Sequence, residues 1–157
     1  MRHTISVLVE NKFGVLTRIT GLFSGRGFNI DTLNVGPTHD DKYSRMTIVV
    51  VGDDQVLDQV LKQLNRLVDV IRVEDYKDGE FLDRELILCK VKVSSKTRSE
   101  VIQISDIFRA KIDDVQPESL TLEMTGNGGK ITKFISLMSN FGIIDLVRTG
   151  QVVLERS

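Results

Sequence analysis

The strongest constraint on the fold is a hydrophobic pattern that changes period along the first 35 residues. Apolar residues alternate over 5–9, as they do in a strand with one buried face. They then recur at helical spacing over 15–23, and this helix is expected to end at Gly25-Arg26-Gly27. A second strand-like stretch occupies 28–35. This order predicts a helix that packs on one face of a sheet.

The rest of the first half continues the same unit. Residues 36–42 predict a hairpin loop, and the β-branched stretch 45–51 predicts the strand after it. Gly52-Asp53-Asp54 is typical of a helix cap. Apolar residues then recur at helical spacing over 56–67, and 68–73 predicts a closing strand.

The second half repeats this order after a polar stretch at 75–83. Thr97-Arg98-Ser99-Glu100 matches a capping box, in which Thr97 and Glu100 satisfy each other's backbone donors. The helix that follows has an apolar side extending to Ile112. The other expected elements are a strand at 84–93, a strand around 120–124, a helix at 131–141, and short strands at 143–148 and 152–155.

Two copies of β-α-β-β-α-β predict an α+β fold made of two tandem ferredoxin-like domains. Each domain would place two helices on one face of a four-stranded antiparallel sheet. We place the first domain at 1–76, the linker at 77–83 and the second domain at 84–157. Small domains of this kind often pair, and exposed sheet edges are natural places for pairing.

The composition argues against several classes of function. The formal net charge is −1 and no dense basic run is present, so nucleic-acid binding lacks its electrostatic basis. No apolar run approaches the ~20 residues of a membrane helix. The first residues lead directly into an alternating strand rather than a secretory signal, and the single cysteine, Cys89, fits a reducing compartment. We therefore expect a cytoplasmic protein.

No catalytic or metal-binding constellation emerges from the sequence. His3 and His39 have no second ligand at metal-binding spacing and are interpreted as surface histidines. Cys89 lies in an apolar strand and is interpreted as a buried, inert thiol. Residues 126–132 are glycine-rich but depart from the phosphate-loop pattern, so a strand-to-helix turn is the better interpretation.

The turn between the first strand and the first helix has a functional interpretation as well as a structural one. A helix N-terminus carries unpaired backbone N–H groups and a partial positive charge, which suit a small anion such as a carboxylate. Gly14 has no side chain to keep a ligand off the backbone. A helix cap at Asn11 and relief of strain at Gly14 would explain the same pattern, so both interpretations stay open.

Residues 6–18 and 21–33 resemble an ACT domain. The subtype resembles the regulatory (small) subunit of acetohydroxyacid synthase, also called acetolactate synthase. Segments 44–48, 63–70 and 84–88 add to this resemblance, which extends over essentially the whole chain. The second half is its looser part.

The resemblance implies a non-catalytic homodimer, paired through its ACT domains, that binds a catalytic large subunit. That large subunit carries thiamine diphosphate, magnesium and FAD, and it condenses two 2-keto acids at the start of branched-chain amino-acid synthesis. The small subunit raises its activity and makes it sensitive to an end product, valine or isoleucine.

In this family the effector lies between two ACT domains. The resemblance places Asn11, Gly14, Val15 and Leu16 on the turn of one chain, and Asn29 and Ile30 on the second strand of its mate. Val15, Leu16 and Ile30 could surround a branched side chain. Valine and isoleucine differ by one methylene, worth only ~0.8 kcal/mol of burial, so the sequence does not decide between them.

Other classes of function remain open at this stage. A stand-alone ACT-domain amino-acid sensor acting on another partner is the main alternative. A transcription regulator would require a DNA-reading segment, and an independent enzyme would require a convergent acid, base or nucleophile; the sequence shows neither. A purely structural dimer would bind no amino acid.

Overall fold

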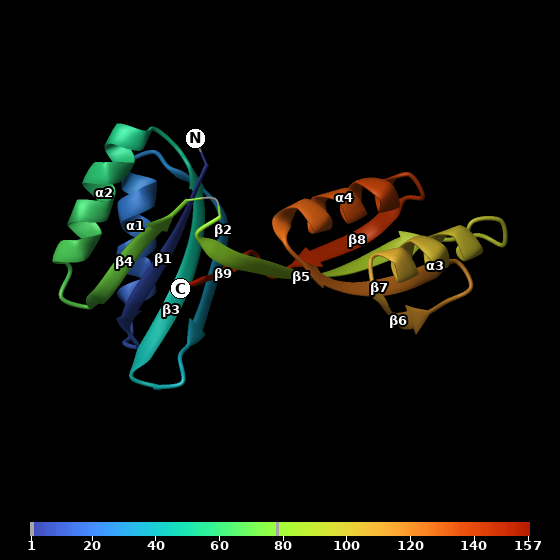
Figure 1. Cartoon of the computed structure of the whole chain (residues 1–157), viewed down its shortest axis with the longest axis horizontal. Coiled ribbons are helices and arrows are strands. Elements are labelled where there is room, and N and C mark those ends of the chain that lie inside the picture. The colour runs from blue at the N-terminus through green and yellow to red at the C-terminus, as the bar shows by residue number, and fades with distance from the viewer. Residues whose placement is uncertain (1, 78) are drawn as a thin grey trace. The chain divides into compact units, whose positions relative to one another are not determined.

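The computed structural model describes residues 2–77 and 79–157. The chain divides into two compact units, one formed by Met1–Leu82 with Gln151–Ser157 and the other by Asp83–Gly150. Each unit consists of a sheet with two helices (Figure 1). The predicted α+β fold with two β-α-β-β-α-β units is confirmed.

The first unit has its six main elements in the predicted order. They are β1 (Arg2–Glu10), α1 (Val15–Gly25), β2 (Asn29–Pro37), β3 (Tyr43–Val51), α2 (Asp54–Arg66) and β4 (Val70–Tyr76). The strands form an antiparallel sheet in the order β2-β3-β1-β4, so β2 and β4 are its edges. Both helices lie on the same face of this sheet (Figure 1).

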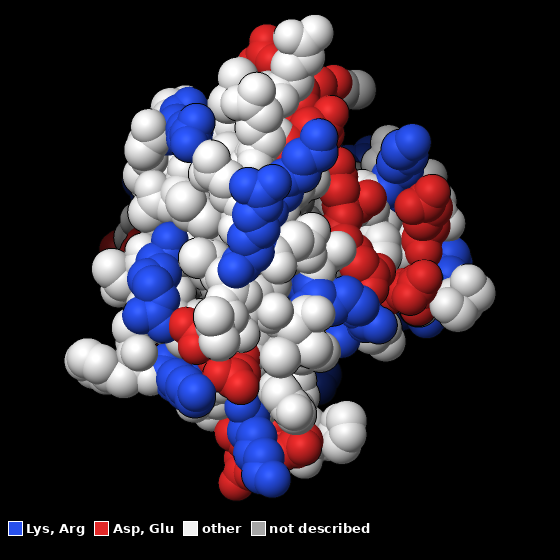
Figure 2. Space-filling view, turned by 90° about the vertical axis from the view of Figure 1, so that its left-hand side faces the viewer, with Lys and Arg blue, Asp and Glu red and all other residues white. Residues whose placement is uncertain are grey.

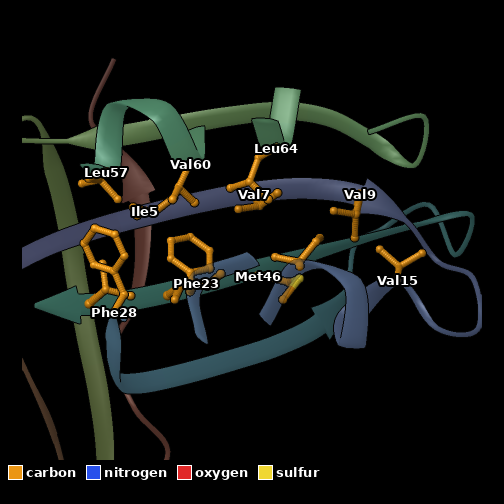
Figure 3. Packing of buried hydrophobic residues seen from close by; sticks show 13 residues of the cluster. Ile5, Val7, Val9, Val15, Phe23, Phe28, Met46, Leu57, Val60 and Leu64 are labelled. Atoms are coloured by element: carbon orange, nitrogen blue, oxygen red, sulfur yellow. The ribbon is translucent and has the colours of Figure 1, made fainter. Parts of the chain in front are cut away.

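The core of the first unit lies between the sheet and its two helices. Alternate residues of β1, namely Ile5, Val7 and Val9, point into it and are at most 2% exposed. Figure 3 shows them beside side chains from both helices. At one end, the rings of Phe23 and Phe28 meet edge to face with centroids 6.3 Å apart. The alternation in the sequence thus identifies the buried face correctly.

The second unit contains β5 (Phe81–Lys92), α3 (Arg98–Ile107), β6 (Lys111–Val115), β7 (Ser119–Gly126), α4 (Gly128–Ser139) and β8 (Ile143–Arg148). Its strands follow the order β6-β7-β5-β8, and β9 (Val152–Glu155) pairs with β5. Its core is a separate cluster built around Cys89, Leu122 and Phe134.

The compact units divide the chain at other residues than the domain limits that we expected. Strand β5 begins at Phe81, inside the stretch 77–83 that we expected to be a linker. Residues 151–157, expected in the second domain, belong to the first unit. The reason is long-range packing, because Val153 of β9 forms a small cluster with Tyr76 and Phe81.

Two expectations for helix α3 are wrong. Thr97 makes no side-chain cap; its Oγ1 accepts a hydrogen bond from the backbone N–H of Ser94 at 2.9 Å. The helix also ends at Ile107, and Ile112 lies in β6, a strand that the sequence did not reveal. Arg109 adopts a left-handed conformation with φ 58°, and the N–H of Ala110 returns to the carbonyl of Ser105 at 2.8 Å, as in a Schellman motif.

Gly52, between β3 and α2, is required by packing. A Cβ atom at this position would lie 2.0 Å from Cε1 and 2.1 Å from Cδ1 of Phe28. That ring is 6% exposed and already packs against Phe23. The expected cap at the next residue is present, because the Asp53 carboxylate accepts hydrogen bonds from the N–H groups of Gln55 and Val56.

Replacing Gly52 by alanine is therefore expected to lower the free energy of unfolding by about 1–3 kcal/mol, because the Phe28 ring must move out of a filled core. Gly21→Ala is the matched control. Its added Cβ meets no atom within 4 Å, and alanine favours the helix by roughly 0.5–1 kcal/mol. Urea unfolding followed by circular dichroism measures both changes. Equal midpoints for Gly52→Ala and the unsubstituted chain would contradict this packing argument.

Candidate functional site

The turn from β1 into α1 presents the start of a helix without a side-chain cap. Gly14 is the N-cap residue, has φ 84°, and no side chain of a described residue bonds to the helix start. The first intrahelical hydrogen bond runs from the N–H of Arg18 to the carbonyl of Gly14 at 3.1 Å. The N–H of Val15 bonds the carbonyl of Lys12 at 3.5 Å, so the N–H groups of Leu16 and Thr17 are the donors of the first turn that could meet a carboxylate. The left-handed φ alone also explains why a glycine stands here.

Asn11 connects this turn to the β2–β3 hairpin. Its backbone N–H donates to the carbonyl of Lys42 at 2.8 Å, and its Nδ2 donates to the carbonyl of Asp41 at 3.0 Å. The Asn11 side chain therefore does not cap α1. It orders the turn by holding it against the hairpin loop.

Two cations lie beside the turn, each paired with an acid. Lys12 Nζ is 2.9 Å from Glu10 Oε2, and this hydrogen bond with Glu10 raises the pKa of Lys12. Arg18 pairs with Asp69, and a Cβ built on Gly14 would lie 3.6 Å from the Arg18 guanidinium. The sequence analysis did not identify this pair. The spacing of four residues could have placed Arg18 above Gly14 on the same side of α1, but nothing in the sequence indicated Asp69 as its partner. The guanidinium lies near the helix start, where its charge is balanced by the Asp69 carboxylate.

The predicted apolar residues of the turn have different environments. Val15 is 3% exposed and belongs to the core, so it offers the site its backbone rather than its side chain. Leu16 is 43% exposed and is the turn-side apolar group open to a ligand. Phe13 at the tip is fully exposed.

Asn29 and Ile30 lie at the opposite end of the sheet from this turn. Asn29 lies opposite Val51 of β3, and Val51 lies opposite Arg2 at the start of β1. The turn follows Glu10, at the other end of β1. The separation is eight residues of β1, or roughly 26 Å. Figure 3 shows the same arrangement, with Phe28 at one end of the core and Val15 at the other. One chain therefore does not bring the six predicted residues together.

His3 is not the surface histidine that we expected. Its Nε2 lies 2.7 Å from Asp54 Oδ1, its Nδ1 lies 3.5 Å from Asp75 Oδ2, and its side chain is 15% exposed. Burial raises the pKa of Asp75. Within residues 2–77 and 79–157, no group of three or more His, Cys, Asp or Glu side chains could hold a metal ion. We assign His3 a structural role that connects β1, α2 and β4.

The glycine-rich segment at 126–132 is a helix start that the chain itself satisfies. Asn127 caps α4 by accepting a hydrogen bond from the N–H of Lys130 at 2.9 Å. The Asp83 carboxylate accepts the N–H of Gly128 at 3.0 Å. A carboxylate of the chain already occupies the position that a phosphate would take, which confirms the interpretation as a turn.

The surface shown in Figure 2 mixes blue basic, red acidic and uncharged side chains, and no basic area extends across it. That face lacks the electrostatic footprint typical of nucleic-acid binding. Among the described residues, no helix has the length and apolar character needed to span a membrane.

Comparisons with known proteins match both halves of the chain. A family model described as the AHAS small subunit-like ACT domain matches residues 5–72, and one described as the small subunit of acetolactate synthase matches residues 84–157. The probable acetolactate synthase small subunit of Archaeoglobus fulgidus is 50% identical over 99% of this chain and 98% of its own length. The acetolactate synthase small subunit of Aquifex aeolicus is 49% identical over 99% of this chain and 81% of its own.

The fold matches a solved structure as well. The crystal structure of the acetolactate synthase small subunit from Thermotoga maritima superimposes with a TM-score of 0.89 at 36% identity. The match covers 100% of this chain and 98% of that one. Both units therefore have a counterpart in one experimentally determined chain.

Cys89 provides a direct test of the assigned core of the second unit. Its side chain is buried, and burial raises its pKa to about 11, so the thiol is almost wholly protonated at pH 8. We expect no labelling of the folded chain by a thiol-reactive disulfide reagent at pH 8 over minutes, and complete labelling in urea. Fast labelling without denaturant would contradict the buried position.

Proposed function

The chain belongs to the family of acetolactate synthase small subunits, and from this premise we propose that it activates a separate catalytic large subunit and makes it sensitive to valine. The proposal assigns the chain a regulatory role. In it, thiamine diphosphate, magnesium and FAD bind to the large subunit, and the effector binds to the ACT domain of this chain.

The observation that carries the proposal is the separation of the predicted site into two halves. The start of α1 after Gly14 has no side-chain cap and leaves the N–H groups of Leu16 and Thr17 open, and Asn29 begins the edge strand β2 at the other end of the sheet. Strand β2 ends at Pro37, which aligns with Ser44 and so with Val9, beside the turn. If the β2 strands of two chains paired antiparallel, Asn29 of the second chain would lie near Pro37 of the first chain and thus near its β1–α1 turn.

Such a pairing would produce two equal sites, each shared by two chains. An amino acid needs donors for its carboxylate and carbonyl oxygens for its ammonium group. The start of α1 supplies donors, and the partner's edge strand supplies carbonyl oxygens. Leu16 of one chain and Ile30 of the other would then contact a branched side chain.

Regulation requires that the effector bind two states of the complex unequally. A coupling free energy of ~1–3 kcal/mol between valine and the active arrangement would give a useful response. Because such coupling is reciprocal, addition of the large subunit would change the affinity of this chain for valine.

The direct test is the acetolactate synthase activity of the cognate large subunit, with and without this chain, across a titration of valine. We expect activity to rise on addition of the chain and to fall again with valine. If the chain changes neither the activity nor its response to valine, the proposal fails, and a stand-alone amino-acid sensor becomes the better account.

Substitutions of Gly14 test the position of the effector carboxylate. Asp and Asn at this position share the strain of a left-handed φ and nearly the same volume, but only Asp adds a negative charge. We expect Gly14→Asp to raise the valine concentration for half-inhibition about tenfold more than Gly14→Asn does, while activation is retained. Equal effects of the two variants would show that charge at this turn is irrelevant to valine.

A further inference from the structure

The sheet of the first unit has a pocket on the face opposite its helices. Its volume is about 500 Å³, within the range of small-molecule sites. Leu8 and Arg45 are aligned neighbours on β1 and β3, and the alternation of the strands directs both away from the core. The residues that line the pocket are Leu8, Pro37, Thr38, His39, Asp40, Tyr43, Arg45 and Leu154.

The pocket is apolar on several sides. Leu8 comes from the sheet, Pro37 from the end of β2, and Leu154 from β9. Gly36 aligns with Arg45 on the same face, and a Cβ built on Gly36 meets no atom within 4 Å. The missing side chain leaves open space beside Arg45 on this face of the sheet.

Arg45 is the unusual group in this pocket. It is half-buried, and no hydrogen bond or ion pair joins its guanidinium to a described residue, so its electrostatic neighbour is the uncharged phenol of Tyr76. By contrast, Arg72 of β4, which lies opposite Leu8, forms an ion pair with Glu74, with 2.7 Å between Nε and Oε1. The nearby Asp40 carboxylate is engaged by the backbone N–H of Lys42 at 3.1 Å. A half-buried cation without a partner favours an anion.

We propose that this pocket binds a small aliphatic carboxylate, with its apolar chain against Leu8 and Leu154 and its carboxylate on Arg45. Neither predicted half of the effector site contributes to this pocket, since Asn11–Leu16 and Asn29–Ile30 do not line it. The guanidinium fork would hold the carboxylate in a bidentate pair.

The pocket is also connected to the β1–α1 turn. Thr38, Asp40 and Tyr43 belong to the hairpin whose Asp41 and Lys42 carbonyls accept the two hydrogen bonds of Asn11. Occupation of the pocket would therefore bias the position of this turn. This consequence rests on the proposed function, whereas binding to the pocket does not.

Hexanoate, with 1-hexanol and hexylamine as matched probes, tests the proposal on the full chain by methyl NMR. We expect hexanoate to shift the Leu8 and Leu154 signals saturably and to bind about tenfold more tightly than 1-hexanol. Hexylamine is expected to bind least. Hexanoate at the start of α1 would instead shift Leu16, so the two sites are distinguished by residue.

Three variants complete the experiment, each checked for an unchanged melting temperature. Arg45→Gln is expected to weaken hexanoate about tenfold and to leave 1-hexanol unchanged, whereas Arg72→Gln changes neither by more than about twofold. Gly36→Val adds a side chain beside Arg45 on the pocket face and is expected to weaken both probes. The proposal is overturned if hexanoate shifts neither Leu8 nor Leu154, or if Arg45→Gln and Arg72→Gln behave alike.

Discussion

The antiparallel register of β1, β3 and β2 holds the β1–α1 turn and the start of β2 at opposite ends of one sheet. The arrangement is rigid because alternate residues of β1 and β3 are buried under two helices, and a shift of one residue would expose that whole apolar face. Any effector that contacts both ends must therefore bridge two chains. The regulatory account depends on this constraint more than on any single side chain.

The turn itself is fixed by few interactions, as the effector site that we propose would require. Gly14 provides the left-handed entry into α1, and Asn11 ties the turn to the hairpin through two hydrogen bonds. Arg18 and Asp69 pair beside it. On one side of the turn, Val15 packs into the core of the first unit, and the other side is exposed to solvent.

Local pattern predicted most of the fold, because the change between periods of 2 and 3.6 residues follows the buried faces directly. The errors arose where contacts distant in sequence decide the outcome. Strand β6 was missed because Arg109, rather than glycine, takes the left-handed conformation that ends α3. The position of β9 depends on packing of Val153 against Tyr76 and Phe81, which no local pattern encodes. For the site, Val15 was expected to contact a branched side chain but its own side chain is buried in the core, and the pairing of Arg18 with Asp69 required the structure.

The most direct test of the central claim is valine binding by mixed dimers of Gly14→Asp and Asn29→Ala, measured by calorimetry after each variant alone is shown to have lost binding. If each site takes its turn from one chain and its strand from the other, a mixed dimer regains one intact site. Random mixing then restores about one site in four. If no binding returns on mixing, the two halves do not come from different chains, and the shared-site account is wrong.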